Sequence, residues 1–297
     1  MPSSGILESW SAVTSSVSTA MIGGCRSSEV LLTTAPIITF LSDYGLDDDF
    51  VGVCHGVMAG ICPQARVIDL THGVPRQDVQ AGALVLHGAL PYLPVGVHLA
   101  VVDPGVGSER RAVAVATADG RRMVGPDNGL LSPAAERAGG VLEAVDIGRS
   151  RFALQPVSAT FHGRDIFAPV AARVAAGAAL AEVGEPVDPQ ALVALELPRA
   201  RLEDGVLVAH AIHVDGFGNV QLDAGEVAFV LGQPVGVATA DGVSARARYG
   251  RTFADVAAGE LLVYEDSYRR LAVAVNQGSA AQRLGLEIGD ELRIAPA

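Results

Sequence analysis

Five apolar, strand-like segments of this chain each end on an aspartate that a turn follows directly. These aspartates are Asp43, Asp69, Asp103, Asp127 and Asp215. Carboxylates are poor strand formers, so an aspartate repeated where strands end indicates a site more than a packing choice. In open α/β sheets, ligands bind just beyond the carboxyl ends of the strands. The pattern therefore predicts several acceptors around one crevice, suited to a small polar or cationic ligand.

Strand and helix patterns alternate over residues 36–198. Apolar residues at helical spacing predict a helix over 48–61 with Asp47 as its N-cap, while Asp78 caps a second helix and Ser132 begins a third. The strands between them are nearly continuous in apolar character, as buried parallel or mixed strands are. The sequence thus predicts an N-terminal wound α/β sheet domain over 36–198.

Beyond Pro198 the pattern changes to short strands separated by turns. The strand segments are GVLVAHAIHVD, GNVQLDA, ELLVYED, YRRLAVAVNQG and GDELRIA. Alternation with regular turn signals predicts a smaller, all-β, barrel-like C-terminal domain over 199–297. Residues 1–35 are rich in Ser and Thr and lack the basic and apolar regions of a secretory signal, so we expect a disordered extension there.

Composition excludes several classes of function. A net charge of −12 without a basic patch argues against nucleic acid and anionic membrane partners. No apolar run reaches the roughly 18 residues that a membrane helix needs. All the basic side chains are Arg, which excludes a Lys-dependent mechanism. Three cysteines without CxxC spacing indicate a reduced, cytoplasmic setting with buried thiols.

The segment LSDYGLDDDF, residues 41–50, contains the first candidate site residue. A carboxylate at a strand end, followed by Gly45, can accept two hydroxyls of a ribose diol. The alternative is an ordinary strand–turn–helix connection in which the acidic run 47–49 serves the helix N-terminus. We favour a functional role for Asp43 and a structural one for residues 47–49.

The segment VIDLTHGVPRQDV, residues 67–79, brings Asp69, His72 and Arg76 close together in sequence. An arginine beside a carboxylate is a permanent cation with a fixed fork of donors. It can hold a hydroxide or lower the pKa of a nearby water. The alternative is a structural ion pair between Asp69 and Arg76 that pins the loop. His72 alone is expected to be structural.

The segment TFHGRDIFAP, residues 160–169, places His162 beside Gly163 in a turn flanked by aromatic residues. Histidine is the general base or hydrogen-bonding partner most easily tuned near neutral pH. A lone histidine is usually structural, but the polar neighbours Arg164 and Asp165 favour a functional role for this one.

Three Gly-rich turns remain. VVDPGVGSERR (101–111) and GPDNGLL (125–131) lack the spacing of phosphate-binding loops. They could line a pocket through backbone N–H groups, or be only tight turns. VDGFGN (214–219) places Asp215 and Asn219 on a turn that is long and aromatic for a simple hairpin.

The segments SDYG, DLTHGV, DPGVG, PDNG, FHGRDIFAP and DGFGN, in this order, resemble the S-adenosyl-L-methionine (SAM) hydroxide adenosyltransferase family of adenosine-forming SAM hydrolases. This family shares a superfamily with the SAM-dependent fluorinase and chlorinase. The resemblance spans about Ile37 to Ile294. It implies a homotrimer in which each active site lies between one subunit's N-terminal domain and a neighbour's C-terminal domain.

The resemblance also implies site residues. The catalytic set of the hydroxide branch falls on Asp69, Arg76 and His162, and ribose binding falls on Asp43. The other implied substrate contacts are Asp103 in the pocket, Asp215, Asn219 and Ser267 for methionine, and Asn276 for adenine, read largely by backbone.

Departures from the fluorinase pattern point to water rather than halide. The fluorinase type carries Tyr where His162 stands and Ser where Gly163 stands. Its Tyr–Pro pair at the halide pocket appears here as Asp103–Pro104, and its long insertion is missing around residues 110–125.

The implied reaction is in-line attack of water on C5′ of SAM, which gives adenosine and L-methionine. Arg76 would hold the incoming hydroxide, and His162 and Asp69 would orient and deprotonate its parent water. Aligned reactants could contribute up to roughly 7–11 kcal/mol. We expect no cofactor and no metal, because SAM is the substrate and its sulfonium is already an activated leaving group.

Three alternatives stay open. A chlorinase-like halogenating enzyme belongs to the same superfamily. A non-catalytic SAM or adenosine sensor would keep the pocket, although it has no need of the catalytic trio. A divalent-metal hydrolase could use Asp43, Asp48 and Asp103, but no paired histidines at ligand spacing accompany them, and chelation would test it.

Overall fold

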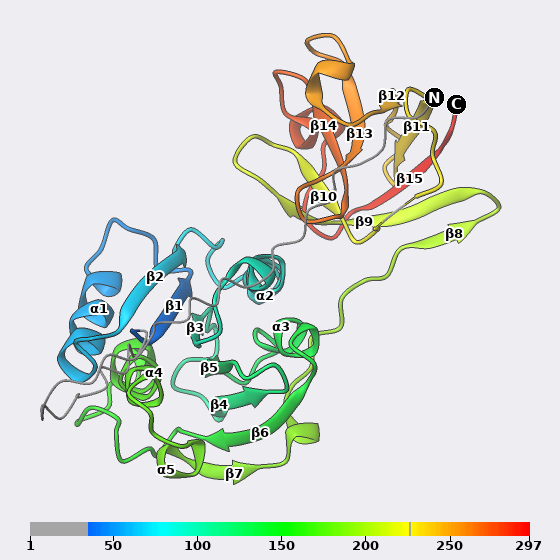
Figure 1. Ribbon diagram of the computed structural model, residues 1–297. Coiled ribbons are helices and arrows are strands. Elements are labelled where there is room, and N and C mark those ends of the chain that lie inside the picture. The colour runs from blue at the N-terminus through cyan, green and yellow to red at the C-terminus, as the bar shows by residue number, and fades with distance from the viewer. Residues whose placement is uncertain (1–34, 226) are drawn as a thin grey trace, which may run out of the picture. The chain divides into compact units, whose positions relative to one another are not determined.

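The computed structural model describes residues 35–225 and 227–297. The extension expected over 1–35 therefore lies, except for its last residue, outside the described part. Within that part, an α/β sheet is followed in sequence by a β-barrel (Figure 1). No helix among the described residues is long and apolar enough to cross a membrane.

The α/β part contains a seven-stranded mixed sheet in the order β2-β1-β3-β5-β4-β6-β7. Strands β2, β1, β3 and β5 are parallel, whereas β4, β6 and β7 pair antiparallel. The bounds are β1 (Ile37–Ser42), β2 (Arg66–Thr71), β3 (Val97–Val101), β4 (Ala112–Thr117), β5 (Arg122–Pro126), β6 (Val141–Asp146) and β7 (Glu185–Val187).

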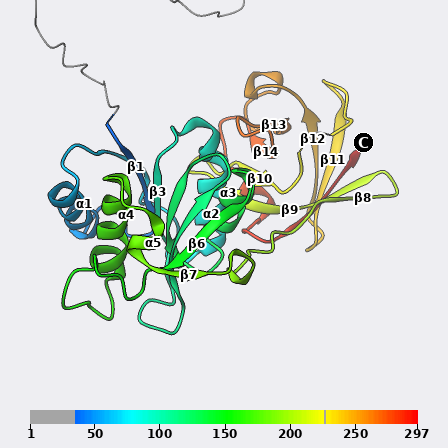
Figure 2. The ribbon, with the colours of Figure 1, turned by 60° about the horizontal axis from the view of Figure 1, so that its bottom comes forward.

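Helices cover both faces of this sheet (Figure 2). One face carries α1 (Phe50–Ile61), α4 (Ala168–Ala175) and α5 (Leu180–Val183), and the other carries α2 (Val79–Ala89) and α3 (Ser132–Arg137). Each face has its own apolar core. The predicted wound α/β architecture is confirmed.

Of the two aspartates expected to cap helices, one does so and the other does not. Asp78 caps α2, since its carboxylate accepts the N–H of Ala81 at 2.9 Å. Helix α1 begins only at Phe50, after Asp49, and makes no side-chain cap there. The N-cap expected at Asp47 is therefore wrong, because the turn after β1 runs two residues further before the backbone becomes helical.

The C-terminal part is a barrel of seven strands, as predicted in outline. The sheet runs β10-β14-β13-β12-β11-β15-β9, and a β9–β10 pairing closes it, while β8 extends β9 as a hairpin. The bounds are β8 (Arg201–Glu203), β9 (Val206–Val214), β10 (Val220–Leu222), β11 (Pro234–Thr239), β12 (Ser244–Tyr249), β13 (Leu261–Glu265), β14 (Leu271–Val275) and β15 (Glu291–Pro296), with α6 (Ala280–Leu284) between the last two strands. The expected boundary at residue 198 falls between β7 and β8.

Strands β11 and β12 were absent from the sequence prediction. In β12 arginines alternate with alanine and tyrosine, so the apolar signal is weak. Antiparallel pairing with β11 and parallel pairing with β13 decide its conformation instead.

One irregularity in β2 bears on the site. Phe40 of β1 pairs with Asp69, but the next residue, Leu41, pairs with Thr71, so Leu70 is the extra residue of a bulge. Asp69 thus lies inside β2 rather than at its end, which corrects the sequence prediction. Bulges re-aim nearby side chains and are frequent beside active sites.

Candidate active site

Three carboxylates mark the carboxyl edge of the parallel strands. Asp43 follows β1 directly, and Asp103 lies two residues after β3. Asp69 lies in the second half of β2, two residues before its end. Because β2, β1 and β3 are neighbours and parallel, their carboxyl ends lie along one edge of the sheet. This is the edge where α/β proteins bind ligands, so this part of the expectation agrees with the structure.

Asp127, at the end of β5, has a different role. Its carboxylate accepts hydrogen bonds from Nε of Arg111 and from the N–H of Val193, both at 2.8 Å. It therefore anchors the segment that follows β7 and is not a candidate for chemistry.

The loops after β1 and β2 are tied together beside Asp43. Oδ2 of Asp43 accepts the N–H of Gln77 at 2.8 Å, and the N–H of Gly45 donates to the carbonyl of His72 at 2.7 Å. Gly45 has a φ of 72°, a region that favours glycine. A ribose diol bound to Asp43 would share this carboxylate with one backbone N–H.

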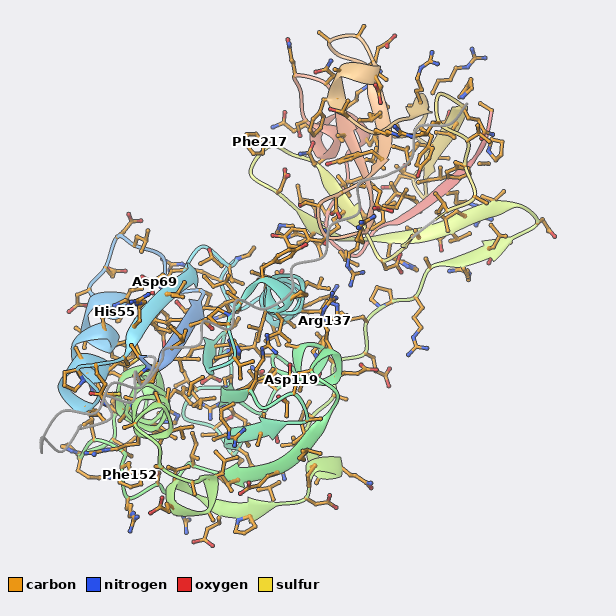
Figure 3. All side chains as sticks on the ribbon, viewed as in Figure 1. His55, Asp69, Asp119, Arg137, Phe152 and Phe217 are labelled. Atoms are coloured by element: carbon orange, nitrogen blue, oxygen red, sulfur yellow. The ribbon has the colours of Figure 1, made fainter. Side chains whose placement is uncertain are left out.

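Asp69 lies between two histidines. Its Oδ1 is 2.8 Å from Nε2 of His55 on α1 and 3.1 Å from Nε2 of His72, which follows β2. Figure 3 labels His55 and Asp69. The Asp69 side chain is 44% exposed and that of His72 only 3%. His72, expected to be structural, is therefore in direct contact with the predicted catalytic carboxylate.

The structure does not form the expected ion pair between Asp69 and Arg76. Arg76 is exposed, and its guanidinium makes no hydrogen bond or ion pair with any residue of the described ranges 35–225 and 227–297. It follows Pro75 in the loop that Gln77 fastens to Asp43. Arg76 is thus an exposed cation four residues after His72.

His162 is held by a different arginine. Nη2 of Arg110 lies 3.0 Å from Nδ1 of His162, and the same guanidinium binds Asp103 through two nitrogens, with Nε donating to Oδ1 at 2.7 Å. The Asp103 and Arg110 side chains are only 6% and 11% exposed. Arg110 also lies over the ring of Phe167, 5.2 Å from its centroid. Asp103 thus anchors Arg110, and Arg110 orients His162.

This contact determines the state of His162. A guanidinium can only donate, so Nδ1 must accept and the neutral ring carries its proton on Nε2. Burial, followed by the positive charge of Arg110, lowers the pKa of His162 below its usual 6.5. At neutral pH the ring is therefore a neutral donor through Nε2–H rather than an imidazolium.

Arg110→Gln is expected to move the acid limb of kcat/KM to higher pH. The neutral ring is lost as pH falls through the lowered pKa of His162, and removing the Arg110 charge raises that pKa while leaving Asp103 to raise it further. The measurement is a pH–rate profile of wild type and variant, with thermal unfolding as a control because breaking a nearly buried pair costs about 3–5 kcal/mol. An unchanged acid limb would contradict the role given to Arg110.

Gly163 allows Tyr44 to approach His162's turn. A Cβ at Gly163 would lie 2.0 Å from the hydroxyl oxygen of Tyr44. Burial raises the pKa of Tyr44 well above 10, so the hydroxyl stays protonated. Tyr44 also packs edge-on against Phe40 and Phe161. Only glycine fits at position 163, because the Tyr44 hydroxyl lies where a Cβ would be. Gly163 begins a single π-helical turn, Gly163–Phe167, that precedes α4.

Gly163→Ala is expected to lower the free energy of unfolding by about 1–3 kcal/mol, because Tyr44 must leave its site among the aromatic rings. Gly56→Ala is the matched control, since its Cβ would meet nothing within 4 Å on helix α1. Urea unfolding of both variants measures the difference. Equal stability of the two would show that Tyr44 moves at no cost.

A second group of predicted residues lines a cavity of the barrel. The cavity has a volume of about 1090 Å³. Asp215, Asn219 and Ser267 line it, together with the aromatic side chains of Phe253 and Tyr264. Its walls combine apolar rings with carboxylate, amide and hydroxyl groups, as expected for a site that takes a ligand with an apolar body and polar ends.

The turn between β9 and β10 is pre-organised by its aspartate. Oδ1 of Asp215 accepts the N–H groups of Phe217 and Asn219 at 2.9 Å, and Oδ2 accepts the Asn219 side-chain amide at 2.8 Å. Phe217 is 83% exposed at this turn (Figure 3). An exposed ring beside a polar cavity is a candidate ligand or partner contact.

Asn276 differs from the other predicted residues of this group. Its side-chain amide donates to the carbonyl of Val256 at 2.8 Å, and its neighbours Val275 and Gln277, but not Asn276 itself, line the cavity. Any contribution of Asn276 to the cavity is through the backbone on either side of it.

Two site residues were missed from sequence. His55 lies on α1, fourteen positions before Asp69, and Arg110 lies in the turn 101–111, for which the sequence suggests at most a pocket lined by backbone N–H groups. His55 could have been identified from sequence, because it is a polar residue on a helix that follows a strand-end aspartate. Arg110 could not, because its partner His162 is 52 positions away.

Both parts of the chain match known protein families. Residues 38–184 match the model described as SAM hydroxide adenosyltransferase N-terminal domain, and residues 209–293 match the corresponding C-terminal domain.

Individual relatives agree with these matches. The chain is 53% identical to the (R)-S-adenosyl-L-methionine hydrolase of Salinispora tropica, covering 89% of this chain and 99% of the relative, and 42% identical to that of Thermus thermophilus, covering 86% and 98%. A fluorinase of Nocardia brasiliensis is more distant, at 29% identity over 87% and 96%. An uncharacterized conserved protein from Thermotoga maritima has a solved structure with a TM-score of 0.82, at 37% identity over 87% and 99% of the two chains.

Proposed function

The chain belongs to the SAM hydroxide adenosyltransferase family, and from that premise we propose that it hydrolyses S-adenosyl-L-methionine by attack of water on C5′, releasing adenosine and L-methionine. The observation that carries the proposal is the 53% identity, over nearly the whole length, with a relative named as a SAM hydrolase. The similarity to the fluorinase of Nocardia brasiliensis is more distant.

Asp69 is the acceptor for the proton of the attacking water. It is the half-exposed carboxylate of the site, and its hydrogen bond with His55 fixes its position. A positioned general base contributes typically 10²–10⁴-fold to a rate. The sulfonium leaves as neutral methionine, so the leaving group needs no proton and the barrier lies in activating and aligning water.

His162 donates a hydrogen bond through Nε2–H to the attacking oxygen or to the nucleoside. This follows from Arg110, which occupies Nδ1. The division of labour differs from the sequence prediction, in which His162 shared the deprotonation with Asp69. Arg110 and Asp103 act as positioning residues behind His162.

Arg76 contributes a positive charge that the described residues leave unpaired. We assign it the incoming hydroxide, as the resemblance implies. Arg76→Ala is expected to lower turnover by orders of magnitude while leaving SAM affinity largely intact, which rapid-quench rates and calorimetric binding would separate. A variant with wild-type turnover would remove Arg76 from the mechanism.

The substrate divides between the two parts of the chain. Asp43 would bind the ribose at the sheet edge, and Asp215, Asn219 and Ser267 would bind the methionine end in the barrel cavity. We further propose a homotrimer, in which each site combines one subunit's sheet edge with a neighbour's cavity. The division of the predicted residues between two domains supports it, and light scattering of the purified protein tests it.

The proposed setting is the cytoplasm. Cys54 and Cys62 are both buried and free, as in proteins of reduced compartments.

The test of the function is incubation with SAM in water enriched in heavy oxygen, with chloride present. Hydrolysis gives adenosine labelled at its 5′ oxygen together with methionine. A halogenated nucleoside would instead assign the chain to the halogenating branch. Retention of SAM without product would make it a sensor.

A further inference from the structure

His55, Asp69 and His72 form a cluster whose chemistry extends beyond general base catalysis. One donor atom from each of the three lies within 4.8 Å of the other two. Two imidazoles and a carboxylate make up a donor set that binds zinc-type ions, whereas Ca²⁺ and Mg²⁺ prefer oxygen alone. The two histidines are not paired at ligand spacing in the sequence, because one comes from helix α1 and the other from the loop after β2.

The strongest evidence is the buried nitrogen of His72. Nε2 of His72 is buried and makes no hydrogen bond within the described part of the chain, although it points at Oδ1 of Asp69 from 3.1 Å. A buried polar atom without a hydrogen bond is rare and needs an explanation. A cation between the three side chains would supply the missing partner.

Nδ1, the other ring nitrogen of His72, has a hydrogen-bond partner that favours metal binding at Nε2. Nδ1 of His72 is 2.7 Å from Oγ of Ser42, which also accepts the N–H of Tyr44. Donation from Nδ1–H to Ser42 leaves a lone pair on Nε2, aimed at Asp69. Metal-binding histidines almost always donate their second N–H in this way, which fixes the tautomer and the ring orientation.

The spacing and exposure also fit a metal ion. Bonds of about 2.0–2.1 Å in a tetrahedral site place donor atoms about 3.3 Å apart. The two distances to Asp69 Oδ1, 2.8 and 3.1 Å, need to open by a few tenths of an ångström, and the two histidine nitrogens, which lie within 4.8 Å of each other, need to reach the same spacing. The His55 and Asp69 side chains are 34% and 44% exposed, so solvent can occupy the fourth position.

We propose that His55, Asp69 and His72 bind one divalent transition metal ion of the zinc type, and that the bound ion stops turnover. The ion takes the place of the proton shared by His55 and Asp69. Its effect on turnover rests on the proposed function: coordination occupies the Asp69 lone pairs that accept the proton of water, and a dipositive ion repels the sulfonium of SAM. The metal-free enzyme is the active form.

Metal binding is tested on the full chain, purified without a polyhistidine tag and stripped with EDTA. Co²⁺ titration is expected to give visible d–d absorption that saturates at one ion per chain and is abolished by added Zn²⁺. His55→Gln is expected to lose this signal. Ser42→Ala is expected to weaken binding by about 10–100-fold, the usual cost of losing such a supporting hydrogen bond.

His210→Gln is the matched control. His210 also pairs with a carboxylate, Asp223 at 2.9 Å, but belongs to no such three-residue cluster in the described chain. The His210→Gln variant should bind Co²⁺ like the wild type. An absence of saturable absorption in the wild type, or a signal that survives in His55→Gln, would overturn the site.

Turnover of SAM is then measured in the same samples. Zn²⁺ is expected to inhibit the wild type over the range in which it displaces Co²⁺, while His55→Gln keeps its own metal-free rate across that range. Co²⁺ binding with no inhibition would overturn the blocking effect. A metal-free wild type that makes no adenosine would refute the proposed function instead, and the Co²⁺ spectrum would still report on the site.

Discussion

Asp69→Asn is expected to lower kcat by about 10²–10⁴-fold, the contribution of a positioned general base. Asparagine has nearly the same shape and can still contact His55 and His72, but its amide does not accept a proton from water. SAM affinity should change much less than turnover, because the carboxylate acts on the attacking water. Single-turnover rates at saturating SAM, together with a binding isotherm, separate the two effects.

The control for this substitution is Asp119→Asn. Asp119 pairs with Arg121 in the turn between β4 and β5, at the amino end of β5 and so at the edge opposite the site (Figure 3). The turnover rate of Asp119→Asn per folded molecule should match that of the wild type. If Asp69→Asn also kept the wild-type rate, Asp69 would not be the base and the site would need another acceptor.

His162→Ala is expected to lower kcat by about 10²–10³-fold, similar to the loss of one well-placed donor in a transition state. The distinguishing variant is His162→Gln. Its side-chain oxygen can accept from Arg110 in place of Nδ1, and its NH₂ can donate in place of Nε2–H.

Partial recovery of turnover in His162→Gln is therefore the result expected of a donor. A general base predicts otherwise, since glutamine cannot take up a proton and would be as inactive as alanine. Equal rates for the two variants would return His162 to the role of base. Thermal unfolding of both variants checks that Arg110 and Asp103 remain in place without the imidazole.

Local sequence was sufficient for much of the fold. Apolar runs ending in Asp43 and Asp103, and the side-chain cap at Asp78, are properties of short segments, and the structure contains them where they were expected. Strands β11 and β12 were missed because their apolar positions are small or alternate with arginine, and pairing with neighbouring strands decides their conformation.

The sequence by itself determined the family and the α/β and barrel architecture, and it supplied the candidate polar residues of the site, because each rests on a motif or a period within one segment. Only the tertiary structure decided which of them touch. Asp69 meets His55 and His72 rather than Arg76, and Arg110 orients His162. Such contacts join elements distant in sequence, and they depend on a bulge in β2 and on helix packing that no local pattern specifies.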